Sequence, residues 1–134
     1  MRTQPCDVGI RRGRLRKAGQ FLEAANLIRD LADENEDVVD AYVTLCVHAG
    51  IAASDVICCS DLGEHAQGEN HNDAIGLLMR VDKEAAKHLN TLLKLKTKSS
   101  YSHTSPTVEE FKRAGRAAEA LVEKARRAHS SLGA

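Results

Sequence analysis

The segment 38–62 constrains the fold most, because it is long, apolar and ended by a glycine. Its apolar residues fall on most of the circumference of a helix: Val38, Val39, Tyr42, Val43, Leu45, Cys46, Val47, Ile51, Val56 and Ile57. A helix that is apolar almost all round has to be covered on several sides. The sequence therefore predicts a central helix that stops at Gly63, since glycine adopts the left-handed conformation that closes helices.

Four more helices are predicted around it. Apolar residues recur every three or four positions from Leu15 to about Glu34, and a short helix is predicted over 72–79. Asp82 is expected to cap a helix that frays near Ser100. Pro106 precedes the last helix, where Thr107 and Glu110 fit a capping box. Short connections favour antiparallel neighbours, so the fold class is all-α, an up-and-down bundle of about four to five helices.

The composition agrees with helices packed into one domain. The chain has 134 residues, enough for one continuous core. It is 43% hydrophobic but only 3% aromatic, so Ala, Leu, Val and Ile must build the core, which favours helices over sheets. Basic residues cluster near the start, and we expect a basic N-terminal tail over 1–11 followed by the bundle over 12–134.

Charge and hydropathy limit the partners and the compartment. Lys plus Arg and Asp plus Glu both number 19, so any contact with nucleic acid must be local. No stretch reaches the roughly 20 uncharged apolar residues of a membrane helix, and the start lacks the apolar core of a signal peptide. The sequence predicts a cytoplasmic protein without membrane contact.

The cysteines and histidines do not predict a metal centre. Three of the four cysteines, Cys6, Cys46, Cys58 and Cys59, lie in the apolar helical pattern, and all are interpreted as reduced core residues. His65 and His71 lack ligand spacing, so no metal is expected. The chain has no glycine-rich phosphate loop and no nucleophile elbow, and no cofactor is expected.

Two places could carry chemistry. The segment 96–103 joins cations, a phenol and an imidazole, and it is either a basic helix end followed by a polar turn or a phosphate-holding acid–base site. Asp55 lies on the polar stripe of the central helix, deep along it and near the loop that contains His65 and His71. It is a candidate binding residue, although a polar stripe also fits a solvated helix face.

A family resemblance rests on three segments: AYVTLCVHAGIAASDVIC, GENHNDAIGLL and LLKLKTKSSY before an Ala-rich last helix. Together they resemble HEPN domains, particularly a small actinobacterial HEPN-like branch, over nearly the whole chain. The resemblance implies an all-α bundle and a homodimer. Catalytic members are metal-independent ribonucleases in which four to six residues separate an arginine from a histidine. Here four residues separate Lys98 from His103, and six separate Lys96 from His103. A lysine replaces the arginine in either case, and lysine cannot form the planar bidentate hydrogen bonds that arginine makes with phosphate.

Two functions follow from the resemblance. The first is a noncatalytic dimeric module that binds RNA, a nucleotide or a partner protein, as in a toxin–antitoxin or phage-defence system. The alternative is an RNA endonuclease in which Lys98, or Lys96, holds phosphate and His103 moves the proton. The resemblance also implies that His71 occupies a shared structural position and that Tyr101 closes the penultimate helix as a buried residue. With Asp55, both are candidate binding residues. A role beside a nucleotidyltransferase is a third, more distant expectation.

Overall fold

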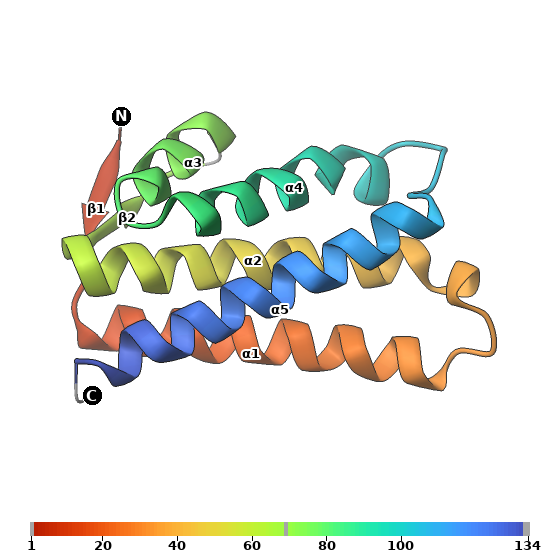
Figure 1. The fold of residues 1–134 in the computed structure, drawn as a ribbon, viewed down its shortest axis with the longest axis horizontal. Coiled ribbons are helices and arrows are strands. Elements are labelled where there is room, and N and C mark those ends of the chain that lie inside the picture. The colour runs from red at the N-terminus through yellow and green to blue at the C-terminus, as the bar shows by residue number, and fades with distance from the viewer. Residues whose placement is uncertain (1, 69, 133–134) are drawn as a thin grey trace.

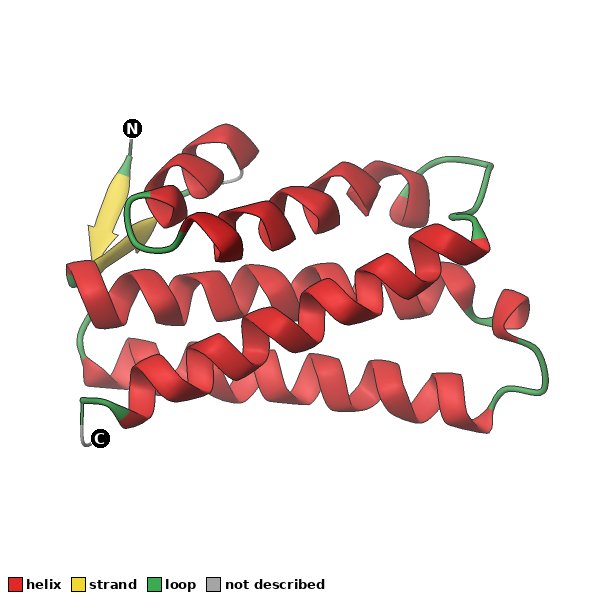
Figure 2. Ribbon diagram, in the orientation of Figure 1, coloured by secondary structure: helices red, strands yellow, loops and turns green. Residues whose placement is uncertain are grey.

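The computed structural model describes residues 2–68 and 70–132, and it is an all-α bundle with a minimal two-stranded sheet (Figures 1 and 2). The helices are α1 (Val8–Leu31), α2 (Val39–Leu62), α3 (His71–Met79), α4 (Lys83–Ser100) and α5 (Val108–Ser130). A 3-10 turn, η1 (Asn35–Asp37), lies between α1 and α2, and the strands are β1 (Thr3–Pro5) and β2 (Glu64–Ala66). The predicted fold class is confirmed.

Helix α2 is the central element. It packs against α1, α4 and α5, and Tyr42, Val43, Val47 and Val56 on it are almost fully buried (Figure 1). By length and composition alone α2 could cross a membrane, but 67% of its apolar window is buried inside the protein. It is therefore the core helix of the bundle, and most of its apolar circumference is covered within one chain.

The predicted signals for the helix ends are confirmed. Gly63 closes α2 with φ 72°, in the left-handed region. The Asp82 carboxylate accepts a hydrogen bond of 3.0 Å from the backbone N–H of Ala85 and so caps α4. At α5 the Glu110 N–H donates to the Thr107 hydroxyl at 3.2 Å, while the Thr107 N–H donates to the Glu110 carboxylate at 2.8 Å. Short polar side chains thus set the helix lengths.

The extent of the N-terminal tail was predicted wrongly. Helix α1 begins at Val8, not near Leu15, because the Asp7 carboxylate caps it by accepting from the Ile10 N–H at 2.9 Å. Before it, β1 pairs antiparallel with β2, Thr3 opposite Ala66 and Pro5 opposite Glu64. The basic run that suggested a tail is the first half of a helix. Residues 35–37 form the 3-10 turn η1, which precedes α2.

The prediction of four reduced cysteines is also wrong. Cys6 and Cys59 form a disulfide that joins residues 53 positions apart, with their Cα atoms 5.8 Å from each other. It ties the segment before α1 to the end of α2. Cys46 and Cys58 are free and buried, as expected of core thiols.

Two glycines allow close helix contacts. A side chain at Gly50 would clash with Leu92 of α4, so α4 can approach α2 closely there only because that position has no Cβ. A side chain at Gly115 would clash with the Tyr42 hydroxyl, so α5 can approach α2 only because that position has no Cβ. Both contacts bring a neighbouring helix onto the central one.

Candidate functional site

A cavity of about 230 Å³ lies between α2, α4 and the segment that leads into α3. Residues at one-turn spacing on α2 and α4 line it, so each helix presents one face. The lining comprises His48, Ile51, Ser54, Asp55, Gly68, Asn70, His71, Ala74, Leu89, Leu93 and Lys96. Leucines and an isoleucine make the walls apolar, while the polar groups converge from three directions. Such a mixture is typical of small-molecule sites.

Asp55 is the most deeply placed charge of this cavity. Its Oδ2 accepts a hydrogen bond of 2.8 Å from Nε of Arg14 on α1, and its Oδ1 lies 3.9 Å from Nδ1 of His65 on β2. Burial raises the pKa of Asp55, although the positive charges of Arg14 and His65 oppose that change. The carboxylate is therefore anchored by α1 while it faces a ligand-sized space.

His48 stands at the exposed mouth of the cavity. Its ring lies 5.5 Å from the Phe21 ring, centroid to centroid, which orients the imidazole against α1. Partial burial lowers the pKa of His48, and the charges of Lys96 and Arg14 lower it further. The imidazole is therefore mostly neutral near pH 7, where one ring nitrogen can accept a hydrogen bond or a proton.

The structure brings together Asp55 and His71, the binding residues predicted from the sequence, and adds Lys96, predicted as the alternative cation. Sequence reasoning gave no role to Arg14 and did not place His48 and His65 at one site. The sequence does contain one indication that Arg14 has a partner. Arg14 lies four residues before Ala18, on the face of α1 that is buried, and a cation at such a position needs an anionic partner.

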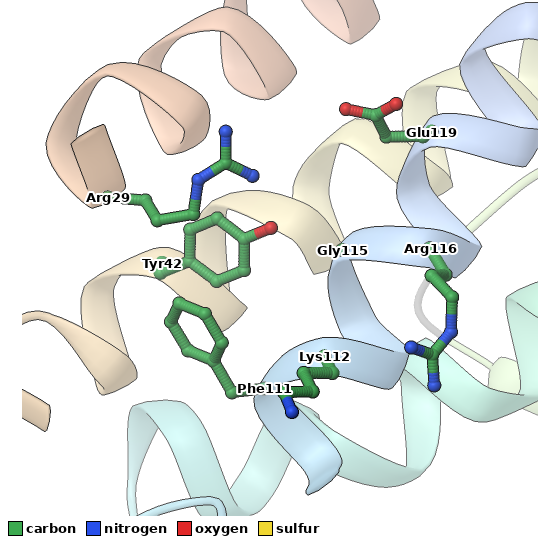
Figure 3. Close-up of a pocket in the computed structure, with 7 residues that line it drawn as sticks. All are labelled: Arg29, Tyr42, Phe111, Lys112, Gly115, Arg116 and Glu119. Atoms are coloured by element: carbon green, nitrogen blue, oxygen red, sulfur yellow. The ribbon is translucent and has the colours of Figure 1, made fainter. Parts of the chain in front are cut away.

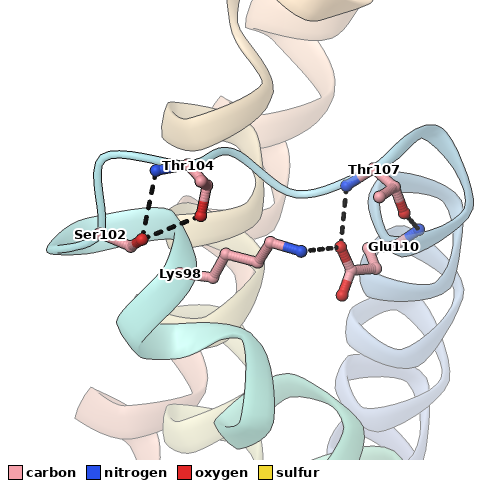
Figure 4. Close-up of polar contacts among 5 residues, drawn as sticks. All are labelled: Lys98, Ser102, Thr104, Thr107 and Glu110. Atoms are coloured by element: carbon pink, nitrogen blue, oxygen red, sulfur yellow. Dashed lines mark hydrogen bonds and ion pairs between the residues drawn. The ribbon is translucent and has the colours of Figure 1, made fainter.

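Lys98 and His103, the catalytic pair of the alternative function, are not arranged for catalysis. Lys98 Nζ lies 2.8 Å from Oε1 of Glu110, which also accepts from the Thr107 N–H (Figure 4). Lys98 and the Thr107 N–H hold the pKa of Glu110 below its usual range. Lys98 is thus committed to a structural ion pair that joins α4 to α5.

His103 lies exposed in the loop between α4 and α5, whose neighbouring residues Ser102 and Thr104 bond to each other (Figure 4). In the described part of the chain its side chain makes no hydrogen bond and lines none of the hollows characterised. An exposed imidazole without an orienting partner is poorly placed for general acid–base work.

Tyr101 follows α4 directly, as the resemblance implied, but it is not buried. Its side chain is 78% exposed, which corrects the expectation of a packed ring. The backbone N–H of Tyr101 bonds to the Thr97 carbonyl at 2.9 Å, so the residue closes the helix through its main chain alone. It does not contribute to the cavity.

Neither a group of metal-binding side chains nor a known family adds to the description of this site. Within residues 2–68 and 70–132, no three His, Cys, Asp or Glu side chains gather closely enough to hold a metal ion. Models of known protein families give no match to the chain, and neither do curated protein sequences. The function is therefore inferred from the side chains of the site.

Proposed function

We propose that this chain is a noncatalytic HEPN-like binding module whose ligand is a nucleotide held in the cavity between α2, α3 and α4. The observation that carries the proposal is the convergence of Asp55, His71 and Lys96 on one apolar-walled space. The volume of about 230 Å³ lies just below the usual range of roughly 300–1,000 Å³ for ligand pockets. It suits a single nucleoside unit, with the phosphate at the open mouth.

The chemistry of the lining matches the parts of a nucleotide. Ile51, Leu89 and Leu93 offer apolar walls for the faces of a base. Asn70 and His71 offer donors and acceptors for its edges. Lys96 is the cation of the lining and can form a charge-assisted hydrogen bond with a phosphate oxygen.

The state of the predicted pair Lys98 and His103 supports a noncatalytic role. Lys98 is held by Glu110 at 2.8 Å, so it cannot neutralise a transition state without breaking that ion pair. His103 stands alone in an exposed loop. Neither group has the preorganised geometry on which electrostatic catalysis depends.

Isothermal titration calorimetry with the four common nucleoside monophosphates tests the proposal. We expect saturable binding with a Kd below about 1 mM for at least one of them. Lys96→Gln should raise that Kd about tenfold or more, because a charged hydrogen bond is lost. Lys94→Gln removes the same charge from an exposed position of α4 outside the cavity and should leave the Kd unchanged. Absence of saturable heat, or equal loss in both variants, would contradict the proposal.

A second candidate function is a metal-independent ribonuclease that uses the cavity in place of the 98–103 segment. One observation favours it: Lys96 lies close enough to His48 to lower its pKa, so a phosphate-binding cation and a neutral imidazole are neighbours. Single-stranded RNA incubated with the protein and a metal chelator tests this candidate, and we expect no specific cleavage. Cleavage lost in His48→Ala would favour the cavity enzyme, whereas cleavage lost in His103→Ala would restore the predicted motif.

A further inference from the structure

A second hollow lies on α1, α2 and α5 and shares no lining residue with the proposed nucleotide cavity. It is an open depression of about 520 Å³. Its lining comprises Arg29, Tyr42, Phe111, Lys112, Gly115, Arg116 and Glu119 (Figure 3). Three cationic side chains and a tyrosine hydroxyl therefore surround one surface depression, in a chain whose formal net charge is zero.

Tyr42 can offer a ligand only its hydroxyl. The residue is 2% exposed, and its ring stacks on Phe111 with centroids 4.2 Å apart. The guanidinium carbon of Arg29 lies over the ring, 5.9 Å from its centroid (Figure 3). A ligand base therefore cannot stack there. Burial raises the pKa of Tyr42 to about 12, so the hydroxyl keeps its proton and remains a donor.

The hydroxyl reaches the depression because Gly115 has no side chain. A Cβ at that position would clash with Tyr42 Oη, so the oxygen lies against the backbone of α5 (Figure 3). The side chains of Cys46 and Arg29 lie near enough to act on the pKa of this hydroxyl, Cys46 raising it and Arg29 lowering it. The hydroxyl lies at the wall of the hollow, where an oxygen of a ligand can accept a hydrogen bond from it.

The cations around the hydroxyl are available. Arg29 Nε bonds to Asp30 at 3.1 Å, which leaves the two terminal nitrogens of its guanidinium. Lys112 and Arg116 are exposed and make no ion pair among the described residues. Glu119 is the carboxylate of the lining, so positive charge exceeds negative charge around the depression.

We infer that this depression is a phosphate-binding site. A tetrahedral oxyanion presents acceptor oxygens in several directions, which matches cations from α1 and α5 and a hydroxyl from α2. A flat aromatic ligand does not match, because both faces of the Tyr42 ring are covered. The phosphate comes either from free inorganic phosphate or from a phosphorylated small molecule such as a nucleoside monophosphate.

Amide chemical shifts measured by NMR during titration with sodium phosphate test this site, with ionic strength held constant by sodium chloride. We expect saturable shifts around Gly115 in the wild type. Arg116→Gln should raise the Kd for phosphate about tenfold or more, and Tyr42→Phe should raise it several-fold while keeping the ring stack. Arg113→Gln removes the same charge one residue outside the lining and is the matched control, with an unchanged Kd.

The outcomes separate the two sites and the two sources of phosphate. Lys96→Gln should not change these shifts, so a failed nucleotide cavity and a failed phosphate site are distinguishable. Tighter binding of adenosine monophosphate than of inorganic phosphate, lost in Arg116→Gln, would identify the phosphorylated molecule as the source. Shifts that do not saturate, or that weaken equally in Arg113→Gln and Arg116→Gln, would overturn the inference and indicate nonspecific screening.

Discussion

Among single residues, Gly115 is one whose replacement the packing should tolerate poorly. We expect Gly115→Ala to reduce the free energy of unfolding by about 1–3 kcal/mol, because the new methyl group would meet the Tyr42 hydroxyl. Alanine has the better helix propensity by about 1 kcal/mol, so a loss would show that the clash dominates. Urea denaturation followed by circular dichroism measures the change.

Two controls isolate that clash. Gly13→Ala on α1 meets no atom within 4 Å and should stabilise the protein by up to about 1 kcal/mol. Adding Tyr42→Phe to Gly115→Ala removes the hydroxyl and should recover most of the lost stability. If the double variant were as unstable as Gly115→Ala alone, the contact would not be the cause.

The disulfide makes a second prediction at this scale. Cys6→Ser should lower the free energy of unfolding by roughly 2–4 kcal/mol, because the cross-link closes a loop between residues 53 positions apart. Burial raises the pKa of Cys58 to about 12, so this neighbouring thiol does not supply a thiolate for exchange. Wild-type protein in excess dithiothreitol should unfold at the same urea concentration as Cys6→Ser in the same buffer. Identical stability of the oxidised wild type and the variant would show that the bond does not form.

The candidate site could be predicted from the sequence only in part. Asp55 was recognisable because a polar stripe interrupts an apolar helix, whereas His71 was assigned through the family resemblance. Arg14 lies 41 residues from Asp55, and nothing local marks the pair. Lys98 was misassigned because its anionic partner Glu110 belongs to the next helix. Charges can be read from a sequence, but their neutralisation by distant residues cannot.

Among the elements, helix ends were predictable where the capping residue acts on backbone groups close to it in the sequence. Gly63 in the left-handed region, the cap at Asp82 and the capping box at Thr107 act within four residues of themselves. The two strands were not predictable, because each has three residues and their pairing spans the whole of α1 and α2. The cap at Asp7 was obscured by the arginine-rich run that follows it.

Asp82 predicts a pH dependence, because it caps α4 and also accepts a hydrogen bond of 2.8 Å from Lys124 of α5. The Lys124 side chain and the Ala85 N–H lower the pKa of Asp82 below its ordinary value of 3.8. A carboxyl whose pKa is lower in the folded state stabilises the fold above that ordinary value, and the contribution is lost as the pH falls through about 4 and below. Asp82→Asn keeps a capping oxygen but removes the charge, so stability measured between pH 5 and 3 should fall less steeply than in the wild type. An unchanged slope would show that the ion pair does not contribute.

For the whole molecule, the structure changes the reason to expect a homodimer. The homodimer was expected from the family resemblance, and α2, the most apolar helix, is already buried within one chain. Val8, Ile10, Met79 and Leu132 are exposed apolar side chains. Four more are Leu27 and Leu31 near the end of α1, Tyr101 after α4, and Val108 at the start of α5. These segments meet at one end of the bundle (Figure 1), where Val39, Pro106 and Val108 line a small hollow of about 80 Å³. A dimer built on this end would leave the proposed nucleotide cavity open.

We predict a homodimer that forms through this end of the bundle, as the family resemblance also implies. Light scattering at tens of micromolar should give twice the mass of one chain, since a Kd in the micromolar range corresponds to about −8 kcal/mol, a modest interface. Leu31 is 75% exposed, so Leu31→Glu would not disturb the monomer, but it would place a charge in the interface and should give the monomer mass. Met79→Glu adds the same charge to an exposed apolar position on α3, at the other end of the molecule, and should leave the dimer intact (Figure 1). A wild type that stays monomeric would rule out the dimer, and dissociation by Met79→Glu alone would move the interface to α3 beside the nucleotide cavity.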